Sequence, residues 1–467
     1  MASGMKDDAD AVWVESGAFR VDRDKALATL AVFQLVDPTR HLLCWVRSAC
    51  AAGATRISLR RMDDRLEMRF DGAAFEPAEL KDPYASLFDK GAKRHRRAPL
   101  RHLAYGLLAA LRTGCASVEV VSGVGERRVC MSAVPGRTER VDPCPEDKET
   151  DTVVWVLGAK GRAAEQALRH VRESCGLCRA EVLVDGEKAA PRAGPRGLLH
   201  LEFKDGDVYG VVSAPEDPWS ASKVRFYSFG VFAAEVEVEL PSVQVLAEID
   251  DDRLHLSASL DGVARNDRYR TALALLDREA VILLEQVSRA LSERLPDTGR
   301  MLREHASARL AWSRVLASGP WCRWRRILIG LRSLFGRHHE ADLARIEEDA
   351  AGLRWLRALC GAFLHSARGP HGEDHARRLG GVPLLLNAAG SVLTLQDIES
   401  LSRREPGLRF WSSSWGELKP ELAQVLGPER ILWCVSTSEL EFLSHRFPLQ
   451  PYQVLVNAKE DPPARAV

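Results

Sequence analysis

The spacing of apolar residues along the first 190 positions predicts a mixed fold. In several segments apolar residues recur every three or four positions, which is the period of an amphipathic helix. This pattern predicts helices at 24–36, 40–52, 77–89, 99–113 and 163–174. Alternation of apolar and polar residues predicts strands at 55–60, 65–71, 117–122, 127–133, 152–157 and 180–185. We therefore expect an α+β sandwich, in which a layer of helices covers a mostly antiparallel sheet.

The pattern changes after a linker rich in Pro and Gly, EKAAPRAGPRG at 187–197. Further strands are predicted at 198–203, 208–213, 223–229, 231–239, 243–249 and 254–259. Residues 267–366 have a helical pattern, with breaks expected at Pro296 and at 318–320. The tail from 382 to 447 predicts a small β-α-β-α-β-α unit with parallel strands. These changes predict four domains, at 11–188, 197–290, 291–380 and 381–457.

Composition and charge narrow the classes of protein to consider. The chain has 467 residues, of which 46% are hydrophobic and 28% charged, as in a folded globular protein. Its 65 basic residues balance 65 acidic ones, so no net field attracts nucleic acid or anionic lipid. No apolar run approaches the roughly 20 residues of a membrane span, and the N-terminus lacks a signal-peptide core. Ten scattered cysteines then favour a reducing, cytoplasmic location.

One predicted helix carries almost no polar chemistry. The segment LLCWVRSACAAGA, from Leu42 to Ala54, contains a single charged residue, Arg47. Its apolar stripe follows helical spacing and consists of Leu42, Trp45, Val46 and Ala49. Small neutral residues occupy a second side of the helix, namely Cys44, Ser48 and Ala51.

The helix and its surroundings resemble the GHKL nucleotide-binding fold and, within it, the heat-shock protein 90 (HtpG) chaperones. MRFDGAAF stands where that family has its D-x-G-x-G strand end. RHLAYGLLAALRTGCASVEVVSG stands where it has a glycine-rich phosphate loop, a helix and a strand. VRFYSFGVFAAEVEVELPSVQVLAEIDDDRLHLSASLDGVARNDRY resembles the first part of the chaperone middle domain. The resemblance covers about 18–290 and implies a Bergerat-type α/β sandwich, then an α/β middle domain, a helical segment and a small C-terminal α/β unit.

The resemblance also implies that most of the ATP-site chemistry is missing. The family's water-activating glutamate falls on Cys44, and its magnesium-binding asparagine falls on Ser48. A thiol is a poor base for this purpose and a poor ligand for the hard Mg²⁺ ion. The catalytic arginine of the middle domain falls on Ala258, and Arg265 or Arg268 could replace it only by moving several residues.

The remaining positions implied by the resemblance concern adenine and phosphate. The family aspartate that binds adenine falls on Phe70, and we expect this ring to point into the pocket. Asp71 is one register off, although a slip could restore it, and Gly72 is retained. The three phosphate-loop glycines of the family fall on Arg101, Ala104 and Gly106, so only one of them is still a glycine here.

Two interpretations of function follow. In the first, the chain is a pseudo-ATPase without a cofactor, which serves as a protein-binding scaffold or chaperone-like subunit of a bacterial assembly for stress or antiphage defence. In the second, it is a divergent ATPase or nucleotide sensor that binds ATP with magnesium. Expected partners are a protein client or complex subunits, with a homodimer as another option. Nucleic acid and a structural metal are not expected.

Other motifs have both a functional and a simpler explanation. CGLC at 175–178 is either a zinc or redox site or a packed helix end. HH at 338–339 and HGEDH at 371–375 are either metal ligands or exposed polar residues. The basic segment 90–101 either binds an anion or is a solvated loop. The basic segment 321–339 either lies on a membrane surface or binds nucleic acid or an acidic partner, or else is an amphipathic helix packed into the helical region. LRFWSSSWGEL at 408–418 offers an aromatic patch for protein contact.

Overall fold

The computed structural model of the chain describes 27, 37–88, 97–144, 149–159, 161–189, 199–215, 221–257, 262–304, 345, 348–349, 351–352, 355–356, 383–387, 389, 391–404, 409–412, 427–434 and 450–451. The chain divides into two compact units. Unit 1 comprises Met1–Ala190 together with Leu256–Asp261, and unit 2 comprises Pro191–His255 together with Gly262–Val467. Predicted helix 24–36 lies outside the described residues except for residue 27.

Unit 1 is built on an eight-stranded mixed sheet with the order β5-β4-β3-β6-β2-β1-β7-β8. The strands are β1 (Arg56–Arg61), β2 (Arg65–Phe70), β3 (Ser117–Ser122), β4 (Val129–Ala133), β5 (Arg140–Pro143), β6 (Thr152–Leu157), β7 (Glu181–Val184) and β8 (Glu187–Lys188). β1 pairs in parallel with β7, and the other neighbours in the sheet are antiparallel. The predicted mostly antiparallel sheet is therefore confirmed.

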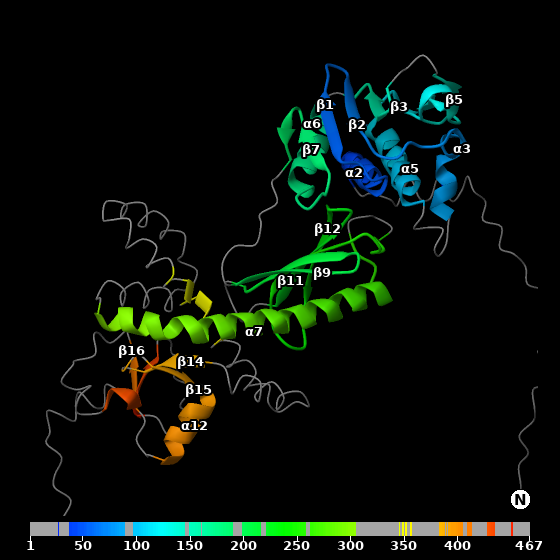
Figure 1. Cartoon of the computed structure of the whole chain (residues 1–467). Helices are drawn as coiled ribbons and strands as arrows, with labels where there is room; N and C mark the ends of the chain where they lie inside the picture. Colours follow the sequence, from blue (N-terminus) through cyan, green and yellow to red (C-terminus); the bar gives the residue numbers. More distant parts are fainter. Residues whose placement is uncertain are drawn as a thin grey trace, which may run out of the picture. The chain divides into compact units, whose positions relative to one another are not determined.

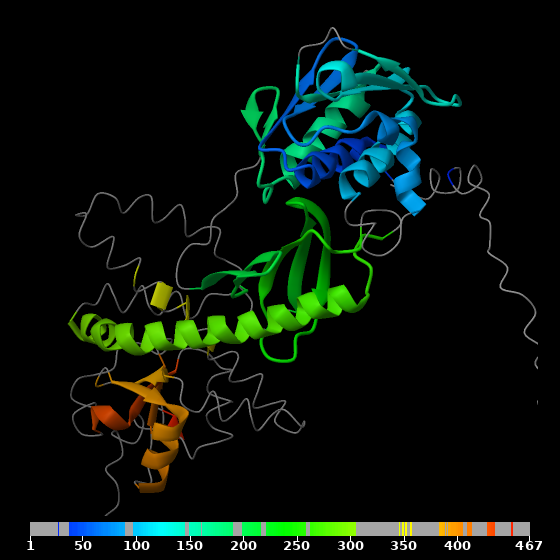
Figure 2. The ribbon, with the colours of Figure 1, turned by 45° about the vertical axis from the view of Figure 1, so that its right-hand side comes forward.

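Helices cover one face of this sheet, as Figures 1 and 2 show. They include α2 (His41–Ala51), α5 (Ala98–Ala110) and α6 (Gly161–Ser174). α2 packs against both α5 and α6. In β2 the alternate residues Leu66, Met68 and Phe70 are buried toward this layer, while Glu67 and Arg69 on the other face are partly exposed. The core of unit 1 therefore lies between the helices and one face of the sheet.

Proline explains one difference from the expected helices of unit 1. The helix predicted at 77–89 is divided into α3 (Pro77–Lys81) and a 3-10 helix, η2 (Pro83–Phe88). Asp82 between them has φ −145° and ψ 71°, because a residue before proline avoids the helical conformation. The predicted helix 99–113 forms α5 and the 3-10 helix η3 (Leu111–Thr113). The short strands β5 and β8 were not predicted.

Unit 2 contains a five-stranded sheet with the order β12-β11-β13-β10-β9. Its strands are β9 (His200–Asp205), β10 (Val208–Ser213), β11 (Ser222–Ser228), β12 (Val231–Val238) and β13 (Leu246–Asp251). Helix α7 (Asp267–Glu304) packs against β9 and β10. The helix continues through Pro296, so the break predicted there is wrong. The described residues of the predicted strand at 254–259 do not extend the sheet.

The C-terminal part of unit 2 has two small sheets. An antiparallel pair is formed by β14 (Pro383–Leu386) and β15 (Val392–Thr394), which is followed by α12 (Leu395–Arg404). A second sheet contains β16 (Arg409–Ser412), β17 (Ile431–Cys434) and β18 (Gln450–Pro451), with β16 parallel to both neighbours. The expected parallel pairing is thus confirmed for β16 to β18, whereas β14 and β15 form an antiparallel pair instead.

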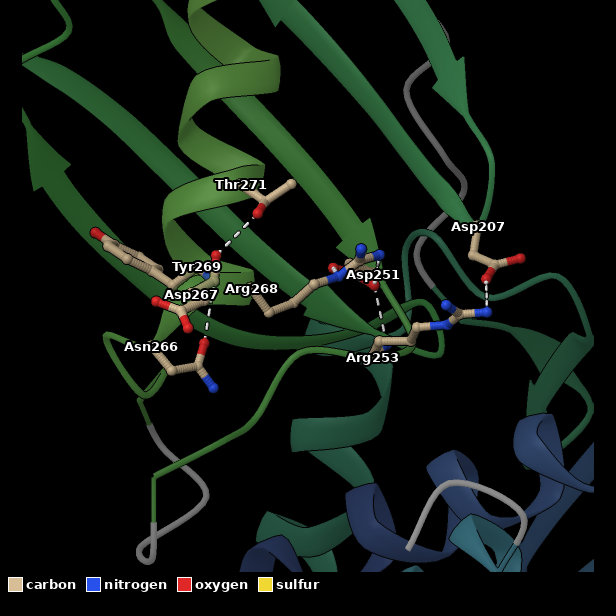
Figure 3. A network of polar contacts seen from close by, with 8 residues as sticks. All are labelled: Asp207, Asp251, Arg253, Asn266, Asp267, Arg268, Tyr269 and Thr271. Carbon is tan, nitrogen blue, oxygen red and sulfur yellow. Dashed lines mark hydrogen bonds and ion pairs between the residues drawn. The ribbon is translucent and has the colours of Figure 1, made fainter. Parts of the chain in front are cut away.

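An ion pair between a buried carboxylate and a partly exposed guanidinium joins the end of β13 to the start of α7 (Figure 3). Asp251 is fully buried, and both of its carboxylate oxygens accept hydrogen bonds from the Arg268 guanidinium, at 2.6 and 2.8 Å. The backbone N–H of Arg253 donates to the same carboxylate at 2.9 Å. A bidentate pair of this kind fixes orientation as well as distance. It therefore sets the angle at which α7 leaves the sheet.

The neighbouring aspartates also have structural partners. Asp250 accepts a hydrogen bond from the Gly230 N–H at 2.8 Å, and Asp252 accepts one from the Phe229 N–H at 3.0 Å. Phe229 has φ 56°, which is unfavourable for a residue with a side chain. The acidic run at 250–252 therefore holds the turn between β11 and β12 and the start of α7.

Among the helices that the structure describes, none combines the length and the apolar character needed to cross a membrane.

We predict that Asp251→Asn lowers the free energy of unfolding by about 3 kcal/mol, because it leaves the Arg268 charge without its buried counterion. The matched control is Asp267→Asn, which alters the exposed Arg270–Asp267 pair of the same helix and should cost less than about 1 kcal/mol. Urea unfolding of the full chain measures both. Equal losses in the two variants would contradict a dominant role for the Asp251 pair.

Candidate functional site

Helix α2 is enclosed on all sides within unit 1. Every residue from His41 to Ala49 is buried, including the side that the sequence analysis placed toward a nucleotide. A helix without an exposed polar face is typical of a core position. The side with Cys44 and Ser48 is therefore part of the protein interior.

The Cys44 thiol has an apolar environment. It is 0% exposed and packs with Ala109, Tyr105 and Leu256, all within unit 1. Burial raises the pKa of Cys44 to about 11, although the nearby Arg47 guanidinium acts in the opposite direction. The group is consequently a neutral thiol at physiological pH and cannot act as a base there.

Ser48 is used to connect two helices. Its Oγ donates a hydrogen bond to the backbone carbonyl of Pro99, in the first turn of α5, at 2.7 Å. Because the Ser48 side chain is buried, this hydrogen bond takes the place of the hydrogen bonds to water that the hydroxyl would make if exposed. Ala51, at the next position on the same side, has no polar atom to offer a metal ion. The implied magnesium position thus serves the contact between α2 and α5.

The three positions aligned with the phosphate loop all lie inside helix α5. Arg101 and Ala104 are buried there, and Gly106 meets the indole ring of Trp45. A Cβ placed on Gly106 would lie 2.1 Å from Trp45 Nε1, far inside the contact limit. Trp45 Nε1 donates to the Leu103 carbonyl at 3.2 Å, which holds the ring against α5. Gly106 is therefore required by close helix packing.

The end of strand β2 is also occupied by structural contacts. Phe70 is 2% exposed and points into the core, as the alternation predicted. The adjacent Asp71 carboxylate accepts hydrogen bonds from the N–H groups of Thr55 and Arg56, both at 2.8 Å, and from the Thr55 hydroxyl. Burial is the largest single influence and acts to raise the pKa of Asp71, but the hydrogen bonds together outweigh it and lower the pKa overall. Asp71 thus anchors the start of β1.

Gly72 allows the chain next to Asp71 to lie close to α2. A Cβ on Gly72 would be 3.0 Å from Ala52 and from the Ala54 nitrogen, and Ala73 N–H donates to the Ala52 carbonyl at 2.8 Å. The chain after β2 therefore runs directly against the exit of α2. A glycine here is explained by close backbone approach.

The arginines proposed as replacements in the middle-domain loop have other surroundings. Arg268 is held by Asp251, as described above, and Arg265 is exposed. Ser257 is partly buried, whereas Ala258 lies outside the described residues. Also outside them are 90–96, 321–339 and 371–375, while only 409–412 of the 408–418 segment is described.

Arg47 is a residue whose importance the sequence analysis missed. It is 2% exposed, and burial lowers the pKa of its guanidinium, while the thiols of Cys44, Cys175 and Cys178 act to raise it. A lone charge in an otherwise apolar helix is the signal that could have drawn attention to it. The sequence alone could not bring α2 together with the distant CGLC motif.

No protein-family model and no curated protein matches this chain. Within the described part of the chain, no group of three or more His, Cys, Asp or Glu side chains is arranged to hold a metal ion.

We predict that Gly106→Ala destabilises the protein by about 2 kcal/mol, because overpacking outweighs the helix preference of alanine. Gly176→Ala is the control, since a Cβ there would meet no atom within 4 Å. Urea unfolding of the full chain reports both effects. Adding Trp45→Leu to Gly106→Ala should recover part of the loss, and purely additive effects of the two substitutions would contradict the contact.

A second prediction concerns the pH dependence of stability. His41 is buried beside Trp45 and its Nδ1 contacts the Pro38 carbonyl, at 3.0 Å. Burial lowers the pKa of His41 to about 4, while the unfolded chain keeps the usual value near 6.5. The unfolded state therefore takes up a proton first as the pH falls. Stability is complete above pH 6.5 and decreases toward pH 4, by roughly 3 kcal/mol from this group.

The difference between the wild type and His41→Gln isolates this effect from that of other acidic groups. We expect the stability advantage of the wild type to shrink between pH 7 and pH 4.5 in urea unfolding experiments. The exposed residue His255 provides the control substitution His255→Gln, which should show no such trend. A difference between wild type and His41→Gln that is independent of pH would disprove the assignment.

Proposed function

We propose that this chain is a GHKL-type, heat-shock protein 90-like pseudo-ATPase that acts in the cytoplasm as a protein-binding scaffold or chaperone-like subunit. The proposal includes the fold family, because the helix layer over a mostly antiparallel sheet agrees with the sandwich that the resemblance implies. Its partners would be a protein client or the other subunits of a bacterial stress or antiphage assembly. Formation of a homodimer would be compatible with this role.

The observation that carries the proposal is the enclosure of the implied catalytic side of α2. Cys44 is 0% exposed and packs with Ala109, Tyr105 and Leu256, and Ser48 is bonded to the backbone of α5. A water-activating base and a metal ligand must both reach solvent and substrate. These positions support the core of unit 1 instead.

The implied adenine and phosphate positions support the same conclusion. Phe70 places a ring in the core where the family has a hydrogen-bond acceptor, and Gly106 lies under Trp45. Asp71 already accepts three hydrogen bonds from the start of β1. Binding of a nucleotide in the family manner would therefore require α2, α5 and β2 to separate.

We predict that the purified chain suppresses aggregation of a heat-denatured reporter enzyme and that ATP with magnesium does not change this effect. Light scattering measures the aggregation, and calorimetric titration with ATP and magnesium should give no saturable heat in the micromolar range. Asp251→Asn is the control variant, because it alters unit 2 and leaves α2 unchanged.

The two readouts separate the competing explanations. Micromolar ATP binding would contradict the pseudo-ATPase and support a divergent ATPase or nucleotide sensor. If the chain neither suppresses aggregation nor gives a saturable heat with ATP, the loss of ATP binding remains supported. The proposal that the chain binds denatured client proteins is then disproved.

A further inference from the structure

The end of α6 places the thiols of Cys175 and Cys178 near the buried guanidinium of Arg47 in α2. Cys175 follows directly after α6 and is 5% exposed, whereas Cys178 is partly exposed, and neither cysteine is in a disulfide. The Cys178 N–H donates to the Cys175 carbonyl at 3.3 Å, which closes a tight turn. Such a turn brings its first and last Cα atoms within about 7 Å, close to the range that a disulfide requires.

The electrostatic environment of these thiols is dominated by Arg47. Its side chain is buried, and the ionisable groups that act on it include the thiols of Cys44, Cys175 and Cys178. A buried guanidinium favours a neighbouring group that becomes negatively charged. Cys44 is fully enclosed and remains a thiol, as shown above. Of the other two sulfurs, that of Cys178 is partly exposed, so it is the one near this cation that a dissolved oxidant can reach.

Metal binding is a weaker explanation for the same residues. A two-thiol site would need further ligands, and none of the described residues joins the pair to form a set of three. The adjacent guanidinium would also repel a metal cation. The arrangement instead fits chemistry in which a thiolate reacts.

We propose that Cys175 and Cys178 form a redox-active dithiol that peroxides oxidise reversibly to an intramolecular disulfide beside Arg47. This site is independent of the proposed scaffold function. In a reducing compartment a disulfide of this kind serves as a redox sensor rather than a permanent crosslink.

The reaction proceeds in two balanced steps. The more accessible Cys178 thiolate attacks one oxygen of hydrogen peroxide, the O–O bond breaks, and hydroxide leaves a sulfenic acid on Cys178. The Cys175 thiolate then attacks this sulfur, the S–O bond breaks, and a second hydroxide leaves as the S–S bond forms. The two thiol protons convert both hydroxides to water. Two electrons have passed from the sulfur pair to the peroxide, and a thiol reductant restores the dithiol.

The chain offers an internal control in a second pair of cysteines. Cys130 lies in β4 and Cys144 directly follows the neighbouring strand β5, and both are partly buried. Burial, together with nearby Glu119, Cys144 and Asp142, raises the pKa of Cys130 to about 11. This pair therefore has an acidic environment where the CGLC pair has a cation.

The first test uses the full wild-type chain and hydrogen peroxide. Trypsin releases Glu173–Arg179, which contains both cysteines, and mass spectrometry should find this peptide lighter by two hydrogen atoms after oxidation. A thiol reductant should reverse the change, and Cys175→Ser or Cys178→Ser should abolish it. The Cys130 thiol should be oxidised at least about tenfold more slowly. A peptide that stays reduced while Cys130 is oxidised would overturn the proposal.

The second test examines the role of Arg47. Arg47→Met should slow alkylation of Cys178 by iodoacetamide at pH 7 by about tenfold, whereas Arg47→Lys should retain most of the rate. Circular dichroism establishes whether each variant is folded. If neither variant folds, the pH profile of alkylation in the wild type decides the question. A midpoint below the usual thiol pKa of about 8.5 supports the proposal, and a higher midpoint contradicts it.

Discussion

The contact between the Trp45 indole and the backbone of α5 at Gly106 is the constraint on which much of unit 1 depends. It lets α2 and α5 approach closely, and this approach brings Ser48 within hydrogen-bond distance of the Pro99 carbonyl. The same packing encloses Cys44 beside Ala109. Helices this close interlock through side-chain shape, so a single added methyl group is expected to disturb the whole interface.

This packing also explains how the interior accommodates polar groups. Ser48, Trp45 and His41 each direct a polar atom to a backbone carbonyl, so their burial leaves few unpaired donors. Arg47 differs from these three residues, because it introduces a full charge into the core of unit 1. A buried charge is costly unless neighbouring groups compensate it, which makes the nearby thiols chemically significant. Helix α2 thus combines the enclosed side chains of Cys44 and Ser48 with a buried guanidinium near the thiols of Cys175 and Cys178.

Much of this fold follows from local pattern. Alternation predicted β2 and the inward position of Phe70, because a strand buried on one face must place every second residue in the core. Proline was less reliable as a signal. Pro83 divides a predicted helix, whereas Pro296 lies within the continuous helix α7. Tertiary packing can maintain a helix across a proline, and no local pattern reports that packing.

Apart from the inward position of Phe70, one feature of the candidate site was predictable. The absence of acidic and amide side chains at Cys44 and Ser48 is visible in the sequence, and it suggested a lost ATP site. The reason for Gly106 was not visible, since a retained glycine fits a phosphate loop and a close helix contact equally well. The same holds for Arg47 and the CGLC motif, which are more than 120 residues apart and meet only through the packing of α2 on α6. The local sequence pattern does not report which distant segments come into contact.

The central claim is that the α2–α5 interface occupies the position of a nucleotide site. Amide hydrogen exchange of the full chain, with and without saturating ATP and magnesium, tests this claim most directly. The account predicts unchanged exchange in α2, in α5 and at the end of β2. Protection of these segments by about a hundredfold, as expected from a ligand present at 100 times its Kd, would contradict it.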